Sequence, residues 1–283
     1  YWGILFVMIF SGCGCCSPPD VIGDISRLRQ DHTFYLSGIS AEQPIVDDAT
    51  QKKLSEDYTR RYFSVWNQDR PRCTREDILW DFDKYGENPG YGENQRKRDR
   101  GWTEALKQSA VLDRYPNRGE RGIVLENTNL RALPTSSPHF DGLDSGSGYP
   151  FDRLQVSAVA VNTPVYISHV SQDGAWVHVE TSFYFGWLPA RDVAPVDESF
   201  VRYWQNGRYA VMIRDSIPIS DGNGRFYFKA PLGAQFPILR EDREYFYVGI
   251  GVPDENRQAV LKISRISRDA AAQRPLKMTR ANL

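Results

Sequence analysis

The side chains best suited to nucleophilic or metal chemistry are four cysteines and four histidines. Three cysteines cluster near the start, at Cys13, Cys15 and Cys16, and Cys73 stands alone. The four histidines are scattered through the chain, at His32, His139, His169 and His178. So few, unevenly placed cysteines form no disulfide framework, and neither set has the paired spacing of a zinc site. We therefore expect no metal and no cofactor.

Cys73 is the only interior cysteine, in the sequence Arg72-Cys73-Thr74-Arg75. Neighbouring arginines and a following helix N-terminus could lower the pKa of its thiol. A cysteine nucleophile also needs a base beside it, and no histidine lies in a segment that can be argued to be adjacent. We therefore assign no catalytic residue to this chain.

The first ten residues, YWGILFVMIF, form a short apolar run. The run is too short to span a bilayer and fits the apolar region of a secretory signal. Small residues precede Cys13, as a lipoprotein signal peptidase requires, so we predict lipidation at Cys13. Residues 1–16 would be the lipoprotein signal and anchor region, and residues 17–50 a tether. A signal cleaved without lipidation and a buried apolar segment are the alternatives.

The N-terminal segment also predicts where the protein is located in the cell. The sequence lacks an initiating Met and a positive leader region, so we expect that it begins inside a longer gene product. An exported lipoprotein of the bacterial cell envelope contacts a membrane only through its lipid anchor, at the inner or outer membrane face.

The charge balance excludes one large class of function. There are 35 basic and 36 acidic residues, with a net charge of -1. Such a chain has no global attraction for nucleic acid. A hydrophobic content of 41% and a length of 283 residues predict a folded chain of about two domains, or three if each is small.

Helical patterns come first along the chain. Apolar side chains lie on one helix face over residues 51–67, and Thr74 can cap a second helix with Ile78, Leu79 and Phe82 packing inward. Residues 102–112 predict a third helix. A basic run at residues 96–98, flanked by acidic residues, predicts a solvated loop. We place a helical domain at residues 51–119.

Strand patterns follow from Gly122. Two alternating runs flank Asp173-Gly174, a strong hairpin signal, and Gly186-Trp187-Leu188 predicts a further short strand. Short strands with a long early loop predict a small barrel, which we place at residues 120–197. A similar order of strand, charged turn and strand recurs, so we predict a second barrel at residues 205–268.

Four consecutive stretches together form a specific pattern. They are Asn129–Thr135, Pro150–Ser157, His169–Trp176 and Gly186–Ala194. Their order resembles that of the first bacterial SH3-like domain in NlpC-type peptidoglycan cysteine peptidases. Upstream, YFSVW at residues 62–66 and GYGEN at residues 90–94 resemble the clip-like helical domain that precedes the barrels in this family. The resemblance covers roughly residues 50–283.

The resemblance implies a mainly β fold with an N-terminal α segment. A helical clip-like domain would precede two tandem small SH3-like β-barrels. Members of the family continue into a papain-like catalytic domain with a cysteine nucleophile and an activating histidine. Residues 269–283 resemble the lead-in to that domain. We therefore expect a truncated, non-catalytic chain, separated from its C-terminal peptidase domain in cis.

The implied function is the binding and positioning of peptidoglycan stem peptides by an exported, lipid-anchored murein endopeptidase. The alternative is a stand-alone envelope adaptor whose barrels bind the wall or a protein partner. An independent enzyme with an unfamiliar site is a third, weaker hypothesis. The nucleotide sequence beyond the codon for Leu283 would separate the first two.

The resemblance also implies where a ligand binds, because the first barrel of the family borders the peptidase cleft. A peptide end there requires a partner charge and an aromatic wall. The candidate ligand-binding residues are Phe140, Tyr149, Phe151, Asp152, Trp176 and Trp187. Asp152 either pairs with a peptide amine or caps a turn. Each tryptophan either forms a groove wall or fills the barrel core.

Overall fold

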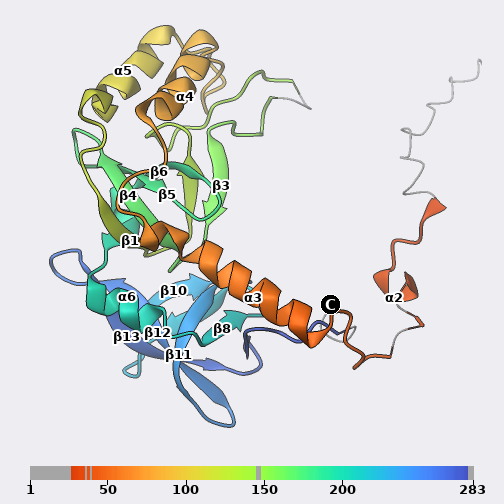
Figure 1. Cartoon of the computed structure of the whole chain (residues 1–283). Coiled ribbons are helices and arrows are strands. Elements are labelled where there is room, and N and C mark those ends of the chain that lie inside the picture. The colour runs from red at the N-terminus through yellow and green to blue at the C-terminus, as the bar shows by residue number, and fades with distance from the viewer. Residues whose placement is uncertain (1–26, 36, 39, 145–147, 280–283) are drawn as a thin grey trace, which may run out of the picture. The chain divides into compact units, whose positions relative to one another are not determined.

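A computed structural model describes residues 27–35, 37–38, 40–144 and 148–279 (Figure 1). The expected signal region and Cys13 lie outside these residues. The chain divides into two units, residues 1–47 with 277–283 and residues 48–276. In the first unit, a short helix α2 (His32–Tyr35) is present, and the Ile45 amide donates to the Met278 carbonyl at 2.8 Å. In the part of the chain described here, no helix combines the length and apolarity that crossing a membrane requires.

The helical part of the second unit contains α3 (Asp48–Tyr62), the 3-10 helix η1 (Ser64–Asn67), α4 (Arg75–Glu87), α5 (Arg100–Ala110) and the 3-10 helix η2 (Leu112–Arg114). The single helix expected at residues 51–67 is thus two elements. No residue of α3 is fully buried, whereas η1 buries Val65 and Trp66.

The cap predicted at Thr74 is confirmed. Its hydroxyl and the Asp77 carboxylate form a reciprocal capping box at the start of α4. Ile78 and Phe82 are buried and Leu79 packs against them, as the helical spacing predicted. This α4 face packs beside α5, and the same hydrophobic core includes Leu133, Leu154 and Trp187 of the first barrel, so the helices pack against that barrel.

The first barrel contains seven strands and a 3-10 turn, η3 (Ala190–Asp192). The strands are β1 (Glu120–Val124), β2 (Thr128–Arg131), β3 (Gln155–Val159), β4 (Pro164–Val170), β5 (Trp176–Glu180), β6 (Phe185–Pro189) and β7 (Val193–Pro195). Their order is β3-β2-β6-β5-β4-β1-β7, with antiparallel pairing throughout. Gly174, with φ of +69°, lies in the β4–β5 turn, so the hairpin prediction is confirmed.

A seven-residue helix, α6 (Glu198–Trp204), leads into the second barrel. Its strands are β8 (Tyr209–Met212), β9 (Ile217–Ser220), β10 (Phe226–Ala230), β11 (Gln235–Glu241), β12 (Tyr245–Pro253), β13 (Ala259–Ser267) and β14 (Ala271–Gln273). Five form a sheet in the order β13-β12-β11-β8-β14, and β9 pairs with β10. The mainly β architecture with N-terminal helices and two SH3-like barrels is confirmed.

Three details differ from the sequence-based expectation. The β9–β10 hairpin was not predicted, because Pro218 and the polar turn at residues 221–225 interrupt its alternation. The helix α6 is too short to show helical periodicity, although Asp197 caps it by accepting from the Phe200 amide at 2.7 Å. Strand β13 continues through Ser267, and β14 pairs with β8, so the sheet includes residues beyond 268.

One hydrophobic core is shared by both barrels. It joins Trp66 of η1 and Ile123 of the first barrel to Trp204 and Phe236 of the second. Asn162, fully buried, makes polar contacts across the same boundary: its Nδ2 donates to the Gly251 carbonyl at 3.0 Å, and its Oδ1 accepts from the Gly251 amide at 3.0 Å. Shared packing and paired hydrogen bonds fix the barrels against each other within this unit.

The buried His178 predicts a loss of stability in acid. Burial, with the nearby His169 charge adding, lowers the pKa of His178 from its usual 6.5 to about 3, so the folded protein keeps this ring neutral. The unfolded chain binds the proton below pH 6.5, so stability is complete above that pH and falls as pH drops towards 3. Between pH 6.5 and 5, His178 should lower the free energy of unfolding by about 2 kcal/mol. Denaturant unfolding at both pH values measures this, and equal stabilities would contradict it.

Candidate functional site

The long loop between β2 and β3 is held together by an internal ion pair. Arg131, at the end of β2, is 5% exposed, and its guanidinium bonds the Asp152 carboxylate. The same guanidinium donates to the carbonyls of Thr135 and Ser137, each at 2.9 Å. The two ends of the loop are therefore fixed by one buried cation.

The Asp152 carboxylate acts as the cap of this loop. One oxygen pairs with Arg131, and the other accepts from the amides of His139 at 2.9 Å and Leu154 at 3.0 Å. Of the two roles left open by the sequence, the geometry provides the capping role. The negative charge is already paired, which leaves it poorly placed to take up a peptide amine.

The loop aromatics differ in exposure. Phe140 is buried and meets Tyr149 edge to face, with ring centroids 5.3 Å apart. Tyr149 is 45% exposed and Phe151 60% exposed. The backbone of Phe140 also bonds to Tyr91, the amide of Tyr91 donating to the Phe140 carbonyl at 2.8 Å. Of these three loop aromatics, Tyr149 and Phe151 therefore present aromatic surface to a ligand.

The two tryptophans have separate surroundings. Trp187, on β6, is fully buried between His169 and His178, so its ring belongs to the barrel core. Trp176, at the start of β5, is half-buried and lines a surface groove of about 470 Å³. Trp187 is therefore a core residue, whereas Trp176 packs against the core and also lines the groove.

The groove at Trp176 combines an aromatic wall with two cations. Ser136 from the early loop, the β4–β5 turn, and residues Pro189–Arg191 line it together with Arg257 from the second barrel. Arg191 has an 83% exposed side chain whose Nε lies 3.4 Å from the Asp192 carboxylate, and Arg257 donates to the carbonyls of Ala190 at 3.1 Å and Arg191 at 2.9 Å. A second hollow of about 270 Å³ shares Ala190 and Arg257 and includes Arg118, so the groove is elongated.

This arrangement suits an extended ligand that bears a carboxylate. Guanidinium groups recognise carboxylates by charge-assisted hydrogen bonds, and the Trp176 ring offers an apolar face beside them. The sequence indicated Trp176 but missed Arg191 and Arg257. Arg257 lies in the turn between β12 and β13 of the second barrel, and no sequence pattern links that turn to the first barrel.

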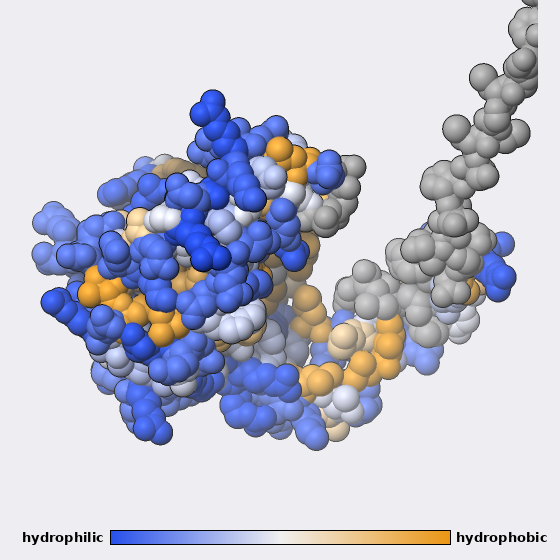
Figure 2. Space-filling view, turned by 90° about the horizontal axis from the view of Figure 1, so that it is seen from above, coloured by the Kyte–Doolittle hydropathy of each residue, from blue (hydrophilic) through white to orange (hydrophobic). Residues whose placement is uncertain are grey.

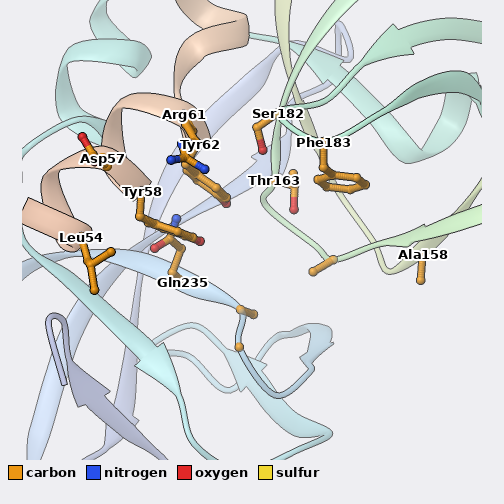
Figure 3. Close-up of a pocket in the computed structure, with 13 residues that line it drawn as sticks. Leu54, Asp57, Tyr58, Arg61, Tyr62, Ala158, Thr163, Ser182, Phe183 and Gln235 are labelled. Atoms are coloured by element: carbon orange, nitrogen blue, oxygen red, sulfur yellow. The ribbon is translucent and has the colours of Figure 1, made fainter. Parts of the chain in front are cut away.

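A separate pocket, of about 570 Å³, lies between α3 and the two barrels (Figure 3). The α3 side contributes Tyr58 and Tyr62, the first barrel contributes Thr163 and Phe183, and the second barrel contributes Gln235. In Figure 3, Phe183 and Thr163 face the pocket from the side opposite Tyr58 and Gln235. No sequence pattern indicated this pocket, because it forms only where three separate segments meet.

Cys73, His169 and His178 are buried in structural roles. Burial, followed by the charges of Asp77 and Glu180, raises the pKa of the Cys73 thiol, so it stays protonated. The Ala110 carbonyl contacts Nε2 of His169 at 2.7 Å, and Ser168 contacts Nδ1 of His178 at 2.8 Å. Across residues 27–279, leaving aside positions 36, 39 and 145–147, no three potential metal-binding side chains cluster together.

Comparison with known families confirms the resemblance that the sequence motifs indicated. Residues 2–115 match the family model of the NLPC_P60 stabilising domain, N-terminal. Residues 138–189 match the model of an SH3 domain of SH3b1 type, and residues 197–243 that of an SH3 domain of SH3b2 type. No curated protein matches the chain.

A solved structure gives the same result for the fold. The chain is similar to an NlpC/P60 endopeptidase from Photobacterium damselae subsp. piscicida, with 25% sequence identity and a TM-score of 0.79. The match covers 90% of this chain and 59% of that protein. The chain therefore spans less than two thirds of the length of the endopeptidase that it matches.

Proposed function

We propose that this chain, which is an N-terminal region of NlpC type with a stabilising domain and two SH3 domains, binds peptidoglycan stem peptides and positions them for a peptidase domain. The similarity to an NlpC/P60 endopeptidase supports a role beside a peptidase. The observation that carries the proposal is the groove at Trp176, because its aromatic wall and two arginines match an extended peptide with a carboxylate.

The proposal assigns roles to three side chains. Trp176 forms the apolar wall, Arg191 binds the peptide carboxylate, and Arg257 both shapes the groove and adds positive charge. Tyr149 and Phe151, on the early loop of the same barrel, supply further exposed aromatic surface. Stem peptides carry several carboxylates, so paired arginines favour them over neutral peptides.

This region binds substrate but does not cleave it. The protonated and buried Cys73 supports that division of roles, because a nucleophilic cysteine must be an accessible thiolate. Cleavage of purified muropeptides by this chain alone would contradict this part of the proposal.

A lipid anchor at Cys13 would hold the protein at the cell envelope, beside the wall. Support comes from the apolar run and the small residues that precede this cysteine. Mass spectrometry of the N-terminal peptide from exported protein tests the anchor: acylated Cys13 is expected, and a free N-terminus at another residue would contradict it.

The groove is tested by removing one of its cations. Arg191→Ala should weaken binding of a soluble stem tripeptide about fivefold to tenfold, because a partly exposed charge-assisted contact contributes about 1 kcal/mol. Isothermal titration calorimetry with the purified tripeptide measures the change. Because the Arg191 side chain is 83% exposed, the melting temperature of the variant should stay constant.

A matched control is Arg214→Ala, which removes an exposed arginine outside the groove. Both variants lose the same charge, so general electrostatic attraction falls equally. Equal tripeptide affinities for the two variants would contradict the assignment of the peptide site to this groove.

A further inference from the structure

The imidazole of His139 is buried without hydrogen bonds. The side chain is 1% exposed, and among the described residues neither Nδ1 nor Nε2 has a hydrogen-bond partner. Nε2 lies 3.7 Å from the Asp141 carboxylate, which is too far for a hydrogen bond. Burying polar atoms without partners is destabilising, so this ring does not hold the fold together through polar contacts.

The ring lies where two loops meet. One is the loop of residues 90–98, between α4 and α5, and the other is the β2–β3 loop, which carries His139. A Cβ atom at Gly90 would lie 2.6 Å from Nε2, so the Gly90 backbone packs directly on the ring. Beside it, the Tyr91 amide donates to the Phe140 carbonyl at 2.8 Å, and the Phe140 amide donates to the Tyr91 carbonyl at 3.0 Å. We call this contact between the two loops the His139 latch.

The titratable and charged groups that face the ring come from three elements. They are Tyr85 of α4, Arg98 of the 90–98 loop, and Asp141, Asp152 and Arg153 of the β2–β3 loop. The two carboxylates are already paired. Asp141 accepts from Arg153 at 2.8 Å, and Asp152 pairs with the buried Arg131.

Arg98 is the cation that opposes a charge on the ring. Its guanidinium stacks on Trp102, 3.7 Å from the ring centroid, and its Nη1 is buried without an acceptor among the described residues. Burial, followed by the Arg98 charge, lowers the pKa of His139 from its usual 6.5, so the closed latch holds the ring neutral. A proton on the ring would add a second cation beside Arg98 while both facing carboxylates remain paired.

From this geometry we propose that His139 is a pH-sensitive latch between the helical segment and the β2–β3 loop. When the ring takes up a proton from solvent, the charged imidazole is far less stable in the buried position than in water. The 90–98 loop therefore separates from the β2–β3 loop, and the ring becomes hydrated. The switch acts on the loop that bears Tyr149 and Phe151, so acid changes how this aromatic surface is held.

The sign of the pH dependence follows from the two states of the latch. In the open state His139 titrates at its usual 6.5, and in the closed state it resists the proton. Closure is therefore complete above pH 6.5 and is lost as the pH falls below that value.

Apolar burial makes the latch close again at neutral pH. Figure 2 shows a mainly hydrophilic face on which hydrophobic residues gather in limited patches. Phe140 is 5% exposed in the closed latch and packs on Tyr149, with ring centroids 5.3 Å apart. Opening exposes this ring to water, which opposes the open state once the proton has left.

The experiment measures amide hydrogen exchange of the full chain at pH 7.5 and pH 5.0, with His139→Phe as the comparison. Phenylalanine fills the space of the ring but cannot take up a proton. Comparing the two proteins at the same pH cancels the intrinsic pH dependence of exchange. The ratio of wild-type to variant exchange at the Tyr91 and Phe140 amides should rise at least about tenfold from pH 7.5 to pH 5.0.

Two controls isolate His139. Asp81 of α4, whose pKa burial raises to about 6, titrates in the same range but is present in both proteins. The Ser171 amide of the β4–β5 hairpin donates to the Trp176 carbonyl at 2.9 Å, and its exchange ratio should stay constant. His139→Gln, which also cannot take up a proton in this range, repeats the comparison if the phenylalanine variant does not fold.

An unchanged ratio at Tyr91 and Phe140 would overturn the inference, because the latch would then not respond to the proton. An equal rise at Ser171 would also overturn it, since the whole barrel would be unfolding. The inference goes beyond the proposed function and does not rest on it. No ligand is added, so the outcome is independent of whether the Trp176 groove binds a stem peptide.

Discussion

Replacing Asp152 by alanine should lower the free energy of unfolding by about 3–5 kcal/mol, the usual effect of removing one partner of a buried ion pair. Arg131 is 5% exposed and would keep its charge without a partner. The amides of His139 and Leu154 would also lose their acceptor. Chemical denaturation monitored by tryptophan fluorescence measures the change.

Two further substitutions test whether the loss of stability comes from the buried ion pair between Asp152 and Arg131. Asp141→Ala removes a carboxylate from the same loop, but its partner Arg153 is 55% exposed, so the expected loss is below about 1 kcal/mol. A double-mutant cycle of Asp152→Ala with Arg131→Met should give a coupling of about 1–3 kcal/mol. Additive effects in that cycle would contradict a direct ion pair.

This prediction changes how the early loop should be probed. A loss of ligand binding in Asp152→Ala would reflect an altered loop as readily as a lost contact, because the carboxylate holds both loop ends. Exposed residues such as Phe151 and Arg191 test binding without that complication.

Asn162→Ala should destabilise the protein by about 3 kcal/mol. The substitution leaves the amide and carbonyl of Gly251 without partners in the boundary between the barrels, at about 1–3 kcal/mol for each buried group. Asn162 also has a left-handed backbone with φ of +62°, which asparagine tolerates better than alanine. Thermal unfolding should show a clear fall in the melting temperature.

Asn162→Gly provides the comparison, because glycine loses the same hydrogen bonds but adopts this backbone freely. The glycine variant should be destabilised by slightly less than the alanine variant. Thr128→Ala is a control within the same barrel, since its hydroxyl bonds only the Asp192 carboxylate and makes no contact with the second barrel. A loss for Asn162→Ala no greater than for Thr128→Ala would show that the barrels do not depend on this contact.

The sequence predicted the elements whose causes are local. Asp173-Gly174 predicted the β4–β5 hairpin because the turn needs glycine, and Thr74 predicted the start of α4 because its side chain caps the next turn. The strand β9 was missed because its burial depends on contacts with distant strands, such as β13. Its four residues, with Pro218 among them, are too short and irregular a pattern to reveal those contacts.

The candidate sites were also predicted only where local sequence determines them. The motifs located the early loop and Trp176, but the role of Asp152 depends on Arg131, a partner 21 positions away. Arg257 reaches the Trp176 groove from the second barrel, and Gln235 reaches the α3 pocket from β11. Such meetings of distant segments depend on how the barrels pack, which local patterns do not encode.

The central claim is that the first barrel binds a stem peptide at the Trp176 groove. The most direct test is an NMR titration of the full chain with the purified stem tripeptide. The account predicts saturable shifts of the Trp176 indole and of the backbone at residues 189–191, and in Arg191→Ala the same shifts should need about fivefold to tenfold more peptide to saturate. Saturable shifts confined to other surfaces, or none at millimolar peptide, would contradict it.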